Sequence, residues 1–160
     1  MEYSYSSRFR KGEIMTIQGL DSLLRKLDKL GKNSTKVVAK AVGEATKKVQ
    51  GDAKDLCPVR EIDGGRLRGS IQGTLQEENR EIIGIVSTNV EYAPYVEFGT
   101  GQRGADSPSP PKYDGDLSYR EDWVGMAAQP YMYPAIKQNE EYIKETIAAS
   151  IKLEIQKKGD

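Results

Sequence analysis

The chain contains no histidine and only one cysteine, Cys57. Without an imidazole, catalytic triads and metal sites that depend on histidine are excluded. A single cysteine excludes an intramolecular disulfide and any zinc site built from thiolates, and a chain without disulfides fits an intracellular origin. Because Cys57 precedes Pro58 at the apolar end of a predicted helix, we expect an inert, packed thiol.

The chain also has few apolar side chains and no net charge. Hydrophobic residues make up 37% of the 160 residues, with two Phe and one Trp, and 24 basic residues balance 24 acidic ones. Zero net charge argues against a general nucleic-acid coat or a basic membrane-surface protein. The length suits one domain. Because the low hydrophobic content allows only a small core, we expect the chain to complete its packing against neighbouring proteins.

Long hydrophobic runs are missing as well. No stretch approaches the roughly 18 consecutive apolar residues of a membrane-spanning helix, and residues 1–5 lack the apolar region of a signal peptide. We therefore expect no membrane partner.

The hydrophobic pattern predicts an N-terminal arm and one domain. Residues 1–13 are polar, with three aromatic and three basic side chains, and form either a frayed terminus or an arm that docks on a neighbour. The domain covers residues 14–158. It begins with a short strand at 14–18 and a short leucine-rich helix that Asp21 caps and Gly31 ends.

Two longer helices are predicted from apolar residues spaced by three, four or seven. The first covers residues 34–56, has an apolar stripe of small residues and ends before Pro58. The second covers residues 134–157, with Pro134 in its first turn and an isoleucine spine. The stripe of the first contains Val38, Ala41, Val42, Ala45, Val49, Ala53 and Leu56, and the spine of the second contains Ile136, Ile143, Ile147, Ile151 and Ile155.

A β-hairpin is predicted between these helices. Alternating residues at 71–78 and the apolar run at 81–89 are joined by a short polar turn. The hairpin follows a glycine-rich turn at 60–70, and Tyr92–Phe98 has the pattern of one helical turn. Residues 99–129 show no helix or strand period, so they are expected to form a long loop insertion that Trp123 anchors. The fold class is therefore α+β: a small antiparallel sheet covered by the two long helices.

Several polar and aromatic residues are candidates for contacts rather than for catalysis. Gly65 and Gly69 are expected to allow positive φ around Arg66 and Arg68, which form either a solvated turn or a carboxylate-binding fork. Glu97 lies between Val96 and Phe98, and a carboxylate in apolar company usually has a cationic partner. We hypothesise that Arg66 or Arg68 pairs with Glu97, within or between subunits.

The aromatic side chains allow two interpretations. They either fill the core over the hairpin or contribute to an intersubunit surface, for which tyrosine is well suited. The candidate interface comprises Arg66, Arg68, Tyr92, Tyr95, Glu97, Phe98, Trp123, Tyr131 and Tyr133.

Two charged segments leave other functions open. Residues 21–48 carry eight basic and three acidic side chains, which form either the solvated face of two helices or a DNA-binding surface. Acidic residues at 114–122 are compatible with a hard cation, and hence with a metal-dependent hydrolase, although their spacing is not that of an EF-hand. No accompanying motif supports catalysis, so we expect neither enzymatic activity nor a cofactor.

Three stretches, in this order, resemble the HK-type minor tail-component family of tailed bacteriophages and prophages. They read DAKDLCPVR followed by GRLRGSI at residues 52–71, YAPYVEFGTG at 92–101 and QPYMYPAI at 129–136. The resemblance covers about residues 20–158. Residues 61–64 enlarge one turn relative to the family pattern, and the loop after Gly101 is longer.

The resemblance implies a structural protein of the virion, assembled in the host cytoplasm. It implies a ring of copies at the head–tail junction that joins the tail tube to the head connector and surrounds the channel through which DNA passes. The implied partners are other copies of the chain, connector or stopper proteins, and tail terminator or tail tube proteins. A tail terminator in the adjacent ring is the alternative within this class.

Overall fold

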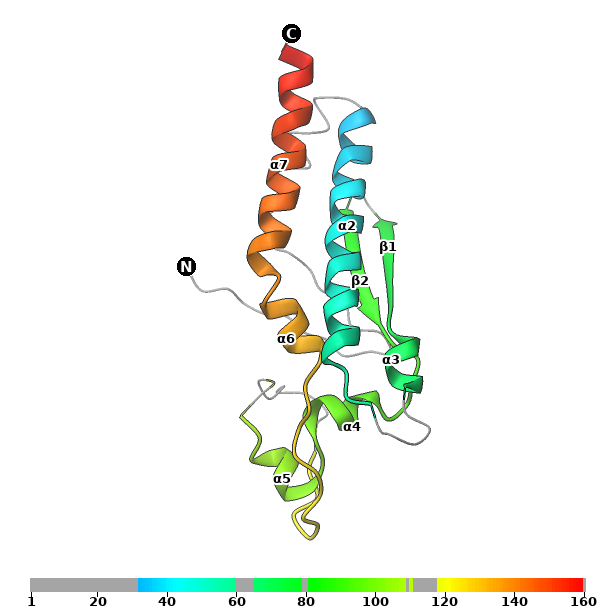
Figure 1. Ribbon diagram of the computed structural model, residues 1–160, viewed down its shortest axis with the longest axis vertical. Helices are drawn as coiled ribbons and strands as arrows, with labels where there is room; N and C mark the ends of the chain where they lie inside the picture. Colours follow the sequence, from blue (N-terminus) through cyan, green and yellow to red (C-terminus); the bar gives the residue numbers. More distant parts are fainter. Residues whose placement is uncertain (1–31, 60–64, 79–80, 109, 111–117, 160) are drawn as a thin grey trace.

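The computed structural model describes residues 32–59, 65–78, 81–108, 110 and 118–159 (Figure 1). The predicted arm, the strand at 14–18 and the helix at 21–30 lie outside the described residues. The described elements confirm the α+β class, with helices around a two-stranded antiparallel sheet.

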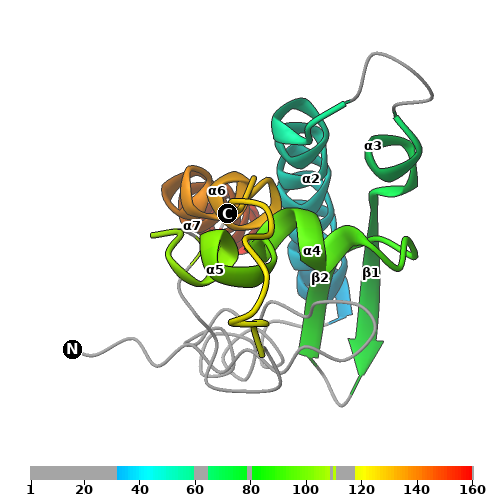
Figure 2. The same cartoon turned by 90° about the horizontal axis from the view of Figure 1, so that it is seen from below.

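Helix α2, Lys32–Leu56, lies between the C-terminal helix and the hairpin (Figures 1 and 2). It matches the predicted helix and begins two residues earlier. Its small apolar residues from Val38 to Ala53 are buried, as expected, whereas Leu56 is exposed at the end of the stripe. The small side chains allow both neighbours to approach α2 closely.

The predicted hairpin is confirmed as strands β1, Gln72–Glu78, and β2, Glu81–Ser87. The strands are antiparallel, with a register that runs from Gln72 opposite Ser87 to Glu78 opposite Glu81. Strand β2 ends two residues before the predicted Asn89. One face of the hairpin packs on α2, because its residues there are glycine or apolar.

Close packing of the sheet on α2 depends on Gly84. A Cβ atom at Gly84 would lie 2.1 Å from the Thr46 side-chain oxygen. That oxygen is held in place because it donates a hydrogen bond of 2.7 Å to the Val42 carbonyl. A larger residue at position 84 would therefore push the sheet away from the helix.

The C-terminal region contains two helices instead of the predicted single helix 134–157. Helix α6 covers Met132–Lys137 and helix α7 covers Glu140–Gly159. The amide of Asn139 donates a 3.1 Å hydrogen bond to the Ile136 carbonyl, and its side chain donates to the Ala135 carbonyl at 2.7 Å. These bonds compete with the regular helical pattern and break the helix.

Helix α7 then runs antiparallel to α2 (Figure 1). Ile143, Ile147 and Ile151 are buried in the core shared with α2, as predicted, whereas Ile155 is exposed. Among the described residues, no helix combines the length and apolar character needed to cross a bilayer.

Two short helices lie on either side of the hairpin in the sequence; one corrects a prediction and the other confirms one. The second half of the predicted turn at 60–70 is helix α3, Arg66–Ser70. Gly65, which precedes it, has the predicted positive φ of 106°, whereas Gly69 lies inside the helix without one. The predicted helical turn after Tyr92 is confirmed as α4, Ala93–Phe98.

The described part of residues 99–129 contains regular structure that the sequence did not predict. It includes helix α5, Gly101–Ala105, and a β-bridge between Thr100 and Met126. A five-residue helix with two glycines is too short to show an apolar period, which explains why the pattern did not predict it. We call the described part of residues 99–129 the lobe.

Candidate assembly surface

Glu97 joins the two ends of the lobe. Its side chain is 4% exposed, on α4 just before the lobe begins. Its carboxylate accepts hydrogen bonds from the backbone amides of Tyr131, Met132 and Tyr133, at 2.8, 3.0 and 2.9 Å. These amides lie just after the lobe, at the start of α6, so one buried side chain fastens both ends of the insertion.

Burial has a clear effect on this carboxylate. Loss of water raises the pKa of Glu97 above its ordinary value of 4.5, and the three amide hydrogen bonds offset only part of that increase. The amides at the beginning of α6 have no intrahelical acceptor of their own. Glu97 therefore satisfies donors that would otherwise be buried without partners.

The predicted pairing of Arg66 or Arg68 with Glu97 inside one chain is wrong. Arg68 forms an exposed ion pair with Asp55 at 3.3 Å, and Arg66 is exposed on α3. Backbone amides supply the stabilisation that the sequence attributed to a cation. Pairing between subunits stays a prediction, which the burial of Glu97 disfavours.

The lobe is held together by its backbone. Thr100 and Met126 exchange two hydrogen bonds, and the amides of Gln102 and Arg103 donate to the carbonyls of Trp123 and Val124. The two segments approach so closely that a Cβ atom at Gly125 would lie 1.9 Å from the Thr100 carbonyl oxygen.

Trp123 anchors the lobe through its backbone and not through its indole. Its carbonyl accepts the 2.9 Å hydrogen bond from Gln102, while its side chain is 51% exposed. The neighbouring Val124 is also exposed. The expectation of an anchored segment is confirmed, but the aromatic ring points to the surface and is available for contacts.

The other candidate aromatics divide into two groups. Tyr131 and Phe98 are 1% and 4% exposed, so their assignment to an interface is wrong and they fill the interior. Tyr133 is half-buried. Tyr92, which immediately precedes α4, and Tyr95, on α4, are exposed, Tyr95 by 61%. We refer to these two residues, together with the exposed Trp123 and Val124, as the lobe-end surface.

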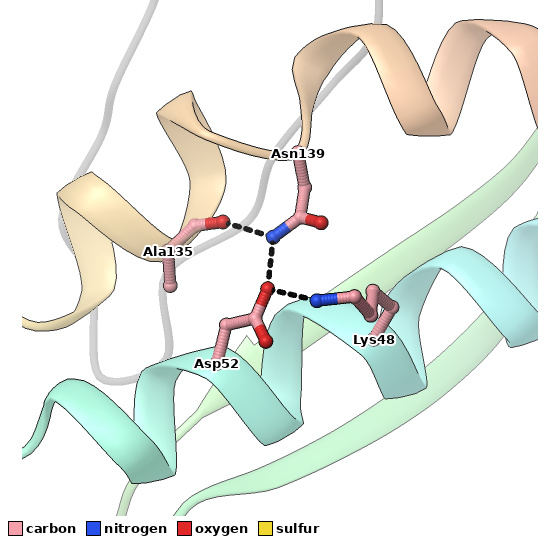
Figure 3. A network of polar contacts seen from close by, with 4 residues as sticks. All are labelled: Lys48, Asp52, Ala135 and Asn139. Carbon is pink, nitrogen blue, oxygen red and sulfur yellow. Dashed lines mark hydrogen bonds and ion pairs between the residues drawn. The ribbon is translucent and has the colours of Figure 1, made fainter.

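A polar network that the sequence analysis missed fastens the α6–α7 junction to α2 (Figure 3). The Asn139 side-chain amide donates to Asp52 at 2.6 Å and to the Ala135 carbonyl, and Lys48 pairs with the same Asp52 carboxylate. The hydrogen bond from Asn139, followed by that from Lys48, lowers the pKa of Asp52 below its ordinary value of 3.8. No local motif predicts this contact, because Asp52 and Asn139 lie 87 residues apart.

Cys57 is buried, as expected, and burial raises the pKa of its thiol. A raised pKa keeps the thiol protonated and therefore unreactive.

The basic character of α2 is partly neutralised within the helix. Lys40 pairs with Glu44, and Lys48 pairs with Asp52. In the part of the chain that the structure describes, no three potential metal ligands cluster. Asp114 and Asp116, which the sequence analysis considered as cation ligands, lie outside the described residues.

Residues 21–99 match the family model HK97-gp10_like, described as "Bacteriophage HK97-gp10, putative tail-component". This match confirms the resemblance to a phage tail-component family for residues 21–99, which contain the first of the three stretches and most of the second. No curated protein and no solved structure matches the chain.

The match ends at Gly99, where the lobe begins. The shared region contains α2, the hairpin and α4, including Glu97. The lobe, α6 and α7 follow it. The exposed pair Trp123 and Val124 is therefore outside the region that matches the family model.

Proposed function

We propose that this tail component forms a ring at the head–tail junction of a phage or prophage particle, where it joins the tail tube to the head connector around the DNA channel. The match of residues 21–99 to a phage tail-component family carries the proposal. The protein then acts through contacts with other copies and with adjoining rings of the particle, without catalysis. Its location is the neck or upper tail of the virion.

The lobe-end surface supports this proposal. Its tyrosine, tryptophan and valine residues are exposed. They belong to α4, to the residue before it and to the segment that follows residue 118, which lie toward the end of the molecule away from the C-terminus of α7 (Figure 1). Tyrosine and tryptophan are the residues most often found at the energetic centre of protein interfaces. A glycine-built backbone holds Trp123 in place, which lowers the entropy lost when it binds.

Binding to isolated tail tubes tests the proposed location. The purified protein is incubated with tail tubes that lack it and then examined by electron microscopy. We expect extra density at the end of the tube that faces the head. Density at neither end, or along the whole tube, would contradict a role in joining.

DNA binding serves as a separate test. The proposal treats DNA as cargo that passes through the ring, so duplex DNA is expected to migrate freely in the presence of the protein at low salt. Retarded DNA whose binding weakens steeply with salt would instead favour the basic helices as a DNA-binding surface.

A further inference from the structure

Within the described part of the chain, the outer edge of strand β1 has no paired strand. The sheet has two strands, β1 lies at the rim of the molecule, and six of its seven residues are exposed (Figure 2). None of the described residues forms a backbone hydrogen bond with this edge. A two-stranded hairpin is marginally stable by itself, and a third strand adds both hydrogen bonds and packing.

Strand β1 has little of the usual protection of an edge strand along most of its length. It contains no lysine, no proline and no bulge, and its only charged residues, Glu77 and Glu78, lie at the tip of the hairpin. Leu75, on the face that meets α2, remains 42% exposed. An added strand with apolar residues on this face would cover it.

The charge at the tip of the hairpin shows which way such a strand would run. Glu78 and Glu81 are directly opposite each other, Glu77 is adjacent, and all three are exposed. Like charges in a cross-strand pair are destabilising. The turn itself carries one basic residue, Arg80, so acidic residues outnumber basic ones three to one in this part of the sequence. No described residue forms an ion pair with any of the three glutamates, so a further cationic partner would stabilise the tip.

The sequence predicts a strand of this kind outside the described residues. Residues 14–18, IMTIQ, have the strand pattern, and three basic residues, Arg8, Arg10 and Lys11, come shortly before them. If 14–18 ran antiparallel to β1, the basic residues would lie beside the acidic tip. The family match begins at residue 21 and does not include this segment.

Distance favours a second copy of the chain as the donor. The Gln50 side chain contacts the Ile71 carbonyl, so the start of β1 lies 18 residues along α2 from Lys32. At 1.5 Å per residue this is about 27 Å along the helix, and the offset from sheet edge to helix increases it to about 30 Å. If residues 21–30 form the predicted helix, residues 18–32 reach about 30 Å, so pairing residue 18 with the start of β1 in the same chain would need a fully straight connection.

We propose that residues 14–18 of one copy add antiparallel to the outer edge of β1 in a neighbouring copy. This inference rests on the proposed ring, because a donor and an acceptor on different surfaces of each copy give the head-to-tail contact from which closed rings are built. The donated strand caps the β1 edge, covers Leu75 and neutralises the acidic tip.

Disulfide trapping between two single-cysteine proteins tests the proposal. Both proteins are full-length chains in which Cys57→Ala removes the native thiol. The donor protein then receives either Thr16→Cys or Ile17→Cys, because neighbouring residues of a strand point to opposite faces. The other protein receives Thr74→Cys or Gln76→Cys, both exposed on β1. Disulfides form only when Cβ atoms come within about 4.5 Å, so they report residues directly opposite each other. Glu141→Cys, exposed on α7, is the matched control.

The donor variant is mixed with the β1 variant and the mixture is oxidised. We expect a disulfide-linked dimer of the two proteins. No such dimer is expected when the α7 control replaces the β1 variant. Light scattering of the reduced proteins is measured in parallel. Two results would overturn the inference and leave the proposed ring intact. One is the formation of oligomers without the cross-link. The other is a cross-link that forms only within one chain when the same chain carries both the donor and the acceptor cysteine. Reduced proteins that stay monomeric would contradict the ring itself.

Discussion

At the residue scale, Glu97 is a buried side chain that holds together two segments of the chain. Its carboxylate accepts three backbone amides next to the buried Tyr131. The substitution Glu97→Ala leaves these amides without an acceptor, and each buried unsatisfied group costs about 1–3 kcal/mol. We expect the free energy of unfolding, measured by urea denaturation, to fall by roughly 3 kcal/mol or more.

The exposed Glu91 provides the control for this measurement. Glu91→Ala is expected to change the free energy of unfolding by less than about 0.5 kcal/mol. Equal effects of the two substitutions would contradict the assigned role of Glu97.

Asp52 gives a prediction of pH dependence. Its folded pKa is lowered below 3.8 by Asn139 and Lys48. A lowered pKa contributes stability that is present above pH 3.8 and is lost as the pH falls through the folded value. We expect the melting temperature of the wild-type protein to exceed that of Asp52→Asn near neutral pH, and the difference to shrink on acidification below pH 3.8. A difference independent of pH would show that the charge of Asp52 does not stabilise the junction.

At the scale of elements, the glycines of the lobe determine whether it can close. Gly125 has φ of 66°, and a Cβ atom there would collide with the Thr100 carbonyl. Gly125→Ala is therefore expected to open the lobe and to speed its cleavage in limited proteolysis. Gly51, in α2, has no heavy atom within 4 Å of the added Cβ, so Gly51→Ala should leave cleavage unchanged and raise stability by up to about 1 kcal/mol. A lobe as resistant in Gly125→Ala as in the wild type would show that the close approach is not required.

The sequence predicted those elements whose apolar spacing is regular over many residues. Helix α2 and the hairpin have such patterns, and their bounds differ from the prediction by one or two residues. The break at Asn139 could not be predicted, because Ile136 and Ile143 continue the helical spacing across it. The side-chain amide of Asn139 that bonds to the Ala135 carbonyl also donates to Asp52, and this second contact, from another helix, has no signature in the local sequence.

The candidate site was predictable in composition but not in arrangement. The sequence singled out Glu97 as a buried carboxylate that needs a partner, yet backbone amides from 34 to 36 residues away have no signature in a side-chain pattern. Similarly, the aromatic content pointed to contacts, but only the fold separates the buried Phe98 and Tyr131 from the exposed Tyr95 and Trp123.

At the scale of the whole molecule, the lobe-end surface should affect assembly without affecting the fold. The paired substitution Tyr95→Ser and Trp123→Ser removes two exposed aromatic rings, so the melting temperature should change little. Loss of central interface aromatics costs about 2 kcal/mol or more, which weakens association by about tenfold or more.

Tyr142→Ser, on the exposed surface of α7, is the control and should leave association unchanged. Equal association of the paired variant and the wild-type protein, measured by analytical ultracentrifugation, would exclude the lobe end from the assembly contacts.

The central claim is that copies of this chain assemble into a closed ring. The most direct measurement is the mass of the purified full-length protein by light scattering, combined with electron microscopy of the same sample. The account predicts a mass that is a fixed multiple of 17.8 kDa and particles with a central opening. A 17.8 kDa monomer at every concentration, with or without tail tubes, would contradict it.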